Sequence, residues 1–105
     1  MELAFRTRKL RTLCQDYDEA VKTMGMSPAD VLRTRLADLR AVTMLADLPA
    51  GRPRIVDAEH PQLRFELLEG WYLLMRVGHE RVPRNEGGGL DLKRVRRAVV
   101  QEISR

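Results

Sequence analysis

The apolar residues of this chain change their spacing about halfway along, and that change restricts the fold more than any other feature. Up to about residue 48 they recur every three or four positions, which is the period of an amphipathic helix. Beyond Pro53 they come in short runs, some alternating with charged side chains, as is typical of strands. Helices and strands that occupy separate parts of one chain favour an α+β fold.

The N-terminal half predicts one strand and two helices. In residues 2–6 apolar side chains alternate with others, which predicts a strand. Residues 8–24 are expected to form one amphipathic helix that ends at Gly25. Ser27 is expected to cap a second helix, which the segment LPAGRP at 48–53 stops. The apolar stripes consist of Leu10, Leu13, Cys14, Tyr17, Val21 and Met24 in the first helix and of Val31, Leu32, Leu36, Leu39 and Val42 in the second. The short linker between them predicts an antiparallel helix hairpin.

The C-terminal half predicts four strands. Their expected ranges are 54–58, 63–68, 71–77 and 96–103. The glycine triplet in VPRNEGGGLDLKRV, residues 82–95, marks a loop ahead of the last strand, because glycine is costly to order inside an element. Trp71 and Tyr72 are adjacent, so one of them must face away from the core. We therefore expect a single domain over 1–105, with the helix hairpin on one face of a mainly antiparallel sheet.

Charge and composition permit contact with nucleic acid without requiring it. The chain has 105 residues, a net charge of +4, and 16 arginines against three lysines. Arginine binds phosphate better than lysine does, because its planar guanidinium matches the geometry of phosphate. A GC-rich genome would, however, produce the same ratio of arginine to lysine. One cysteine, Cys14, excludes an internal disulfide. Because no apolar run is long enough to span a bilayer and the first residues lack the apolar core of a signal peptide, a cytoplasmic location is expected.

No known metal or cofactor motif is present. The two histidines stand apart, and the glycine triplet does not open a helix, so it is no phosphate cradle of the P-loop kind. What remains is a group of basic residues in the strand half: Arg52, Arg54, His60, Arg64, Arg76, His79, Arg81 and Arg84. Each alone is most simply a solvated surface residue. Together, on a sheet face without helices, they would hold a phosphodiester, with arginines offsetting phosphorane charge and a histidine transferring a proton.

Three stretches of the sequence resemble motifs of one protein family, and the resemblance covers nearly the whole chain. LAFRTRKLRTLC resembles an opening strand followed by KLxKLC, and RLADLRAVTMLADLPAGRP resembles the second helix and its exit. VPRNEGGGLDLKRVRRAVVQEI resembles the signature VPRxExGGLDxxxVxxVxxxEI. These motifs are similar to those of the HigB-like killer toxins of type II toxin–antitoxin (plasmid maintenance) systems, within the RelE superfamily.

The resemblance implies a RelE-type fold and an mRNA endonuclease that acts on the ribosome and inhibits growth. It also implies a helix-turn-helix antitoxin as partner, with operator DNA contacted only through that antitoxin. For the antitoxin contact we expect exposed apolar surface of the helix pair around Met24, Met26 and Met44, although these methionines also suit the core. No cofactor is implied.

The sequence departs from the family pattern at three places. The family's basic segment, resembling LKGDRKGQ, is here VDAEHPQL, with Asp57 and Pro61 in place of lysines and His60 in place of an arginine. The family's YRL reads Tyr72-Leu73-Leu74, and its ending EIxDYH reads EISR. One hypothesis is that a tail beyond Arg105 was lost or truncated, with the missing group supplied elsewhere. Each loss removes a phosphate-facing charge or a proton-transfer group.

Two functions therefore follow from the sequence. In the first, a metal-independent RNA endonuclease uses His60, Arg64 and Arg76 for catalysis. Its RNA-binding residues are Arg52, Arg54, Arg81 and Arg84. In the second, a homologue weakened in catalysis acts as a binding protein for its antitoxin or another partner. The first requires His60 or His79 within reach of Arg64 or Arg76, and the second expects these residues to be scattered.

Overall fold

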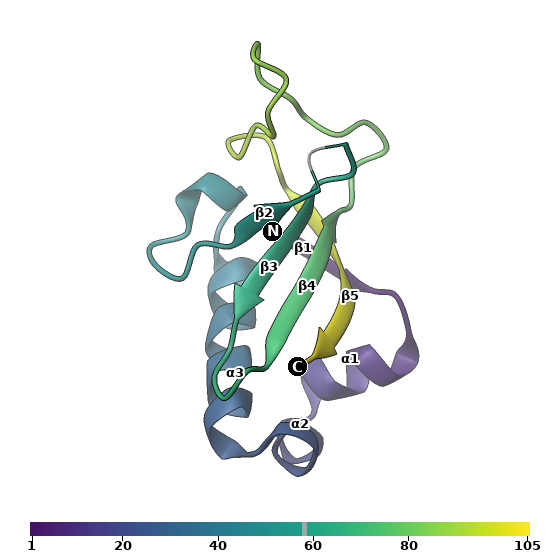
Figure 1. Cartoon of the computed structure of the whole chain (residues 1–105), viewed down its shortest axis with the longest axis vertical. Coiled ribbons are helices and arrows are strands. Elements are labelled where there is room, and N and C mark those ends of the chain that lie inside the picture. The colour runs from purple at the N-terminus through teal and green to yellow at the C-terminus, as the bar shows by residue number, and fades with distance from the viewer. Residues whose placement is uncertain (58) are drawn as a thin grey trace.

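The computed structural model describes residues 1–57 and 59–105, and in it three helices cover one face of a five-stranded sheet (Figure 1). The strands are β1 (Glu2–Phe5), β2 (Arg54–Val56), β3 (Gln62–Glu66), β4 (Tyr72–Val77) and β5 (Arg97–Ser104). The helices are α1 (Arg8–Gln15), α2 (Tyr17–Met24) and α3 (Met26–Ala41), and a single 3₁₀ turn, η1, spans Leu45–Asp47. The predicted α+β class is confirmed.

The sheet has the strand order β1-β5-β4-β3-β2. The first strand pairs parallel with the last, and the other neighbours are antiparallel, as the sequence predicts for a mainly antiparallel sheet. Successive strands β2, β3 and β4 are joined by short connections, whereas β1 reaches β5 only across the rest of the chain. The register shifts between Leu74 and Met75, where β5 bulges.

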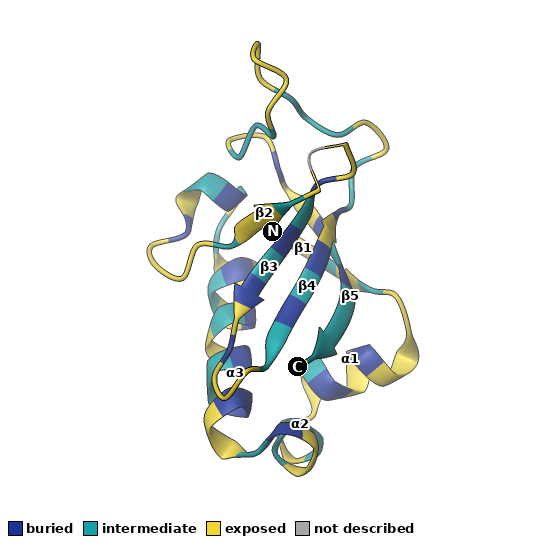
Figure 2. Ribbon diagram, viewed as in Figure 1, coloured by how far each residue is buried: buried dark blue, intermediate teal, exposed yellow. Residues whose placement is uncertain are grey.

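The core lies between the helices and the near face of the sheet. On β3 and β4, buried residues alternate with more exposed ones (Figure 2), so that Leu63, Phe65 and Met75 face the helices. Leu32 and Leu36 of α3 are 1% exposed and belong to the same cluster. The alternate residues of the strands lie on the other face, which no helix covers, and Tyr72 is among them. Trp71 instead packs against the core, so the two adjacent aromatics do face opposite ways.

The prediction of one helix over 8–24 is wrong. Asp16 adopts an extended conformation, with φ −113° and ψ 102°, and divides the segment into α1 and α2. Its carboxylate accepts a hydrogen bond from the backbone N–H of Glu19 at 3.3 Å and so caps α2. The side chain of an aspartate can cap the start of a helix, which interrupts a longer helix at that residue. Here Asp16 forms such a cap, although the helical spacing of apolar residues continues past it.

The second predicted helix is also displaced at both ends. Ser27 lies inside α3 and is not its cap, because Gly25, with φ +90°, takes that position. The helix ends at Ala41 rather than near residue 48. Beyond it, the backbone N–H groups of Leu45 and Ala46 bond to carbonyls of the segment ahead of β5, so tertiary hydrogen bonds replace helical ones.

The predicted strands are found with shifted ends, and all but the last are shorter than predicted. β2 stops at Val56, because Asp57 has φ +59°, which no strand residue adopts. The last position predicted for this strand, residue 58, lies outside the described residues.

The glycine triplet forms the tip of an organised loop. The carboxamide oxygen of Asn85 accepts from the backbone N–H groups of Gly87 and Gly89, and Gly88 has φ +83°. An isolated bridge joins Arg84 to Leu90 across the turn. This positive φ explains a glycine at 88, and the asparagine closes the turn with its own side chain.

Candidate functional site: two arginine-lined hollows

Three of the predicted site arginines lie on the face of the sheet that the helices leave open. Arg54 of β2 pairs directly with Arg64 of β3, and Arg76 of β4 pairs with Gln62, two residues before Arg64. Cross-strand partners, and residues two apart on one strand, share a face. The sheet register therefore brings together Arg54, Arg64 and Arg76, as the sequence predicts.

Arg54 and Arg64 line a hollow of about 240 Å³ at the β2 edge of the sheet. The other residues around it are Arg35, Gly51, Arg52 and Glu66. We call these six residues the sheet hollow. Four guanidiniums face a single carboxylate there, so the hollow is suited to an anion such as phosphate. Arg76 lies on the same face but does not line it.

Arg35 reaches this hollow from α3 and is a site residue that the sequence analysis missed. It is ion-paired with Asp38 one turn further along, at 3.7 Å. Its guanidinium lies directly against Gly51, where a Cβ atom would come within 2.3 Å of Arg35 Cζ. Gly51 also has φ +66°, so both its backbone and its surroundings require glycine. The segment GRPR thus positions an arginine of a distant helix.

Contacts on the open face orient Arg64. Its Nε donates to the Glu66 carboxylate at 2.7 Å, and its Cζ lies 4.0 Å from the centroid of the Tyr72 ring. The Tyr72 hydroxyl in turn donates to Glu102 at 3.0 Å. A guanidinium held between a carboxylate and an aromatic ring is pre-oriented for a ligand. Sequence alternation placed one aromatic outward but gave no sign of the two carboxylates.

Neither histidine lines the sheet hollow. His60 is exposed in the connection between β2 and β3, where its backbone N–H donates to the Asp57 carboxylate at 3.2 Å. His79 follows β4, and its Nε2 accepts from the backbone N–H of Arg96 at 2.9 Å. That ring nitrogen is occupied by a structural hydrogen bond, which fixes His79 in the tautomer protonated at Nδ1.

The remaining two predicted RNA-binding residues, Arg81 and Arg84, lie in a different hollow, of about 500 Å³, in the long connection between β4 and β5. Its complete lining is His79, Arg81, Val82, Pro83, Arg84, Arg94 and Arg96. We call it the loop hollow. The predicted basic residues therefore lie in two hollows, except His60 and Arg76, which line neither. Arg94, from the predicted loop, and Arg96, the first residue of the predicted last strand, complete the loop hollow.

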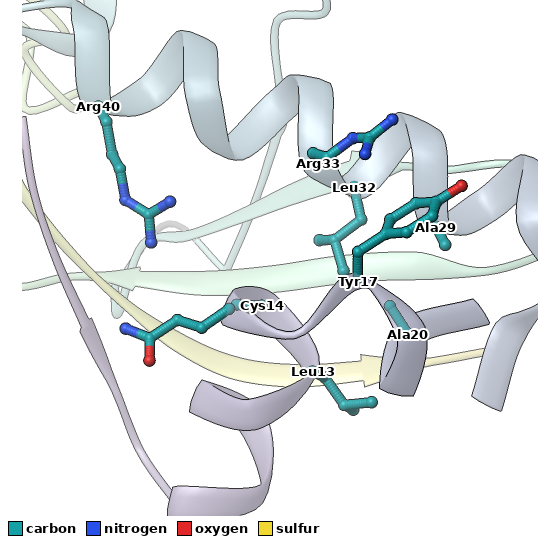
Figure 3. A pocket seen from close by; sticks show the side chains of 9 residues that line it. Leu13, Cys14, Tyr17, Ala20, Ala29, Leu32, Arg33 and Arg40 are labelled. Atoms are coloured by element: carbon teal, nitrogen blue, oxygen red, sulfur yellow. The ribbon is translucent and has the colours of Figure 1, made fainter. Parts of the chain in front are cut away.

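A third cavity, of about 480 Å³, lies between the helices (Figure 3) and has both apolar and polar residues in its lining. It has apolar walls from α1, α2 and α3, and Arg33 stacks on the Tyr17 ring at 4.1 Å. Burial raises the pKa of the Cys14 thiol to about 12, against a smaller opposing effect of Arg40. A thiol that stays protonated at neutral pH is a poor nucleophile.

The methionines predicted to meet an antitoxin differ in exposure. Met24 is 4% exposed and belongs to the core, Met44 is half-buried, and Met26 is 64% exposed at the start of α3. Only Met26 thus offers the adaptable apolar surface that was expected.

Within 1–57 and 59–105, no three histidine, cysteine, aspartate or glutamate side chains gather as metal ligands would. No helix in this described part of the chain has the length and apolar character needed to cross a membrane. Comparisons of the chain with known protein families, with curated proteins and with solved structures each find no match.

Proposed function

We propose that this protein is the toxin component of a type II toxin–antitoxin system, with the RelE-type fold of the HigB-like killer toxins, and that it cleaves mRNA on the ribosome. The observation that carries this proposal is the cross-strand pair Arg54–Arg64 in a hollow at the β2 edge of the sheet. The order of strand, helices and antiparallel strands is compatible with the resemblance carried by VPRNEGGGLDLKRVRRAVVQEI.

In this proposal the sheet hollow binds the scissile phosphate. The RNA 2′-oxygen attacks phosphorus, its proton passes to a base, and the 5′-oxygen leaves with a proton. Arg54 and Arg64 offset the charge that develops on the phosphorane oxygens. Glu66 is the one carboxylate that lines the hollow, so we assign it the role of base, and water in the open hollow protonates the leaving oxygen. His60 would act only if its loop approached the hollow.

The test is expression of the chain in a bacterial host, followed by mapping of cleaved mRNA on purified ribosomes. We expect growth arrest with the native sequence and its loss with Arg54→Gln. Arg8→Gln, which removes an exposed arginine of α1 far along the sequence from either hollow, is the matched control. Absence of both growth arrest and cleavage with the native chain would contradict the proposal.

One observation favours a second function, that of a binding protein with weakened catalysis. The histidines lie outside the sheet hollow, which separates the predicted proton-transfer groups from Arg64. Such a protein would bind RNA in a manner that depends on Arg54, yet leave the RNA intact. Glu66→Gln separates the two, because it would abolish cleavage in an enzyme that uses this carboxylate as the base and would leave RNA binding intact in a binding protein.

The proposed partner is a helix-turn-helix antitoxin. Exposed apolar side chains available for it are Met26 and Leu68, which are 64% and 48% exposed. Co-purification with the product of a neighbouring helix-turn-helix gene, and its reduction by Met26→Glu, tests this part of the proposal. Operator DNA is expected to bind only when that partner is present.

A further inference from the structure

The loop hollow has the features of a separate anion site. We propose that it binds phosphate groups of an RNA backbone independently of the sheet hollow, as a second point of attachment for the same strand. The choice of RNA as the ligand rests on the proposed function, whereas the anion site rests on the geometry of the loop alone.

The hollow is built by a loop whose backbone is fixed. Arg84 donates from Nη1 to the carbonyl of Gly88 and from Nη2 to the carbonyl of Glu59, both at 2.9 Å, so it ties the loop tip to the β2–β3 connection. Arg94 donates from Nε to Asp91 at 2.8 Å and from Nη2 to the carbonyl of Arg84. These two arginines connect the walls of the hollow through hydrogen bonds to backbone carbonyls.

The other two arginines are available to a ligand. Arg81 and Arg96 are exposed, and within the described part of the chain no hydrogen bond or ion pair engages either guanidinium. No carboxylate lines the hollow, in contrast to Glu66 in the sheet hollow. Like charges around one cavity repel each other, and an anion bound between them would relieve that repulsion. Arginine binds phosphate through two parallel N–H donors, which favours a phosphodiester.

The shape of the molecule favours an extended polyanion over a small one. The protein measures 44 × 26 × 22 Å, and the loop between β4 and β5 projects beyond the end of the sheet, along the long axis (Figure 1). Arg76, on the open face of β4, lies near the end of that strand from which the loop begins. An RNA strand bound at the sheet hollow and running along the long axis would reach this projecting loop.

The experiment measures binding of a fluorescent single-stranded RNA of about 15 nucleotides by anisotropy across a range of salt concentrations. The test variant is Arg81→Gln/Arg96→Gln, and the matched control is Arg8→Gln/Arg40→Gln, which loses the same charge from exposed helical positions. Because each phosphate contact on single-stranded nucleic acid contributes about 0.7 to the slope of log K against log salt, we expect the test variant to lose about 1.4 from that slope. The control should lose markedly less.

Equal losses in the two double variants would overturn the proposal, because a general charge effect would then explain both. A poly-glutamate peptide that competes with RNA at equal concentration, and whose binding also requires Arg81 and Arg96, would overturn it in favour of an acidic protein partner. Thermal unfolding of every variant shows whether the fold is retained.

The same assay distinguishes this inference from the proposed function. If Arg54→Gln leaves RNA affinity unchanged while Arg81→Gln/Arg96→Gln lowers it, the loop site stands and the sheet site fails. The reverse result would overturn the loop site and leave the proposed function intact.

Discussion

The two hollows are both rich in arginine, but different parts of the structure hold them in place. The sheet hollow draws its arginines from α3, β2, β3 and the segment before β2, and beneath it Leu63 and Phe65 are 0% and 2% exposed. The loop hollow draws all its residues from the single connection between β4 and β5 and depends on exposed hydrogen bonds. We therefore expect the loop hollow to open locally without global unfolding more readily than the sheet hollow.

The largest effect on the cleavage rate is expected for a substitution in the sheet hollow, where the reaction is proposed to take place. Arg54→Gln removes a guanidinium that offsets charge on the reacting phosphate, and such losses cost about a hundredfold in rate. Arg81→Gln removes only a binding contact remote from the reacting atoms, and should lower the rate severalfold at limiting RNA. Single-turnover cleavage on ribosomes measures both. Equal losses would mean that the two hollows play the same role.

Gly51→Ala tests whether Arg35 belongs to the sheet hollow. Its Cβ would collide with the Arg35 guanidinium, so we expect RNA affinity to fall about tenfold, the order expected when one charge-assisted contact is lost. Gly70→Ala is the matched control, because Gly70 also has positive φ, +81°, but no atom within 4 Å of the added Cβ. Both variants should lose about 1–2 kcal/mol of stability from backbone strain. RNA binding that falls equally in both would exclude a specific role for Arg35.

Asn85→Ala tests the local character of the loop hollow. The change removes the acceptor for two backbone N–H groups, each worth about 1 kcal/mol. We expect faster amide hydrogen exchange at Gly87 and Gly89 and no change at core positions such as Leu73. Asn85→Asp keeps an acceptor oxygen and should largely preserve protection. If core amides also lost protection, the loop would be part of the global folding unit.

The smallest effect concerns pH. The hydrogen bond from Arg94 lowers the pKa of Asp91 below its ordinary value of 3.8, against a smaller opposing effect of desolvation. A depressed folded pKa stabilises the fold above the unfolded pKa, and that contribution is lost as the pH falls through the folded value. The Arg94–Asp91 pair should therefore stay intact between pH 5 and 8 and weaken only below about pH 4. NMR titration of the Asp91 carboxyl measures this, and Asp91→Asn should remove the dependence.

Much of the sheet was predictable because strand signals are local. The alternation in LRFEL places Leu63 and Phe65 on one face and Arg64 on the other, and a single strand is enough to establish this. The helices were less predictable, because Asp16 can serve either as an interior residue or as a cap. Only the geometry of the folded chain selected the cap.

The site was predictable only in part. Sequence reasoning found three of the arginines, because the alternation of side chains along paired strands places them on one face of the sheet. These are Arg54, Arg64 and Arg76. Arg35 was missed because its partner, Gly51, lies sixteen positions further along the chain, beyond the end of the helix. The alternation of Arg94 and Arg96 around the buried Val95, which is 0% exposed, is the sequence signal that both arginines face away from the core.

The sequence by itself determined the α+β class, the strand faces and the existence of a glycine loop ahead of the last strand, because hydrophobic period and turn chemistry act over a few neighbouring residues. That this loop is ordered by the Asn85 side chain was decided by the structure. The tertiary structure decided which cations meet, since that depends on strand register and on contacts between segments far apart in the chain. It separated a single predicted group of basic residues into two hollows, and it left His79 as the acceptor of a backbone hydrogen bond.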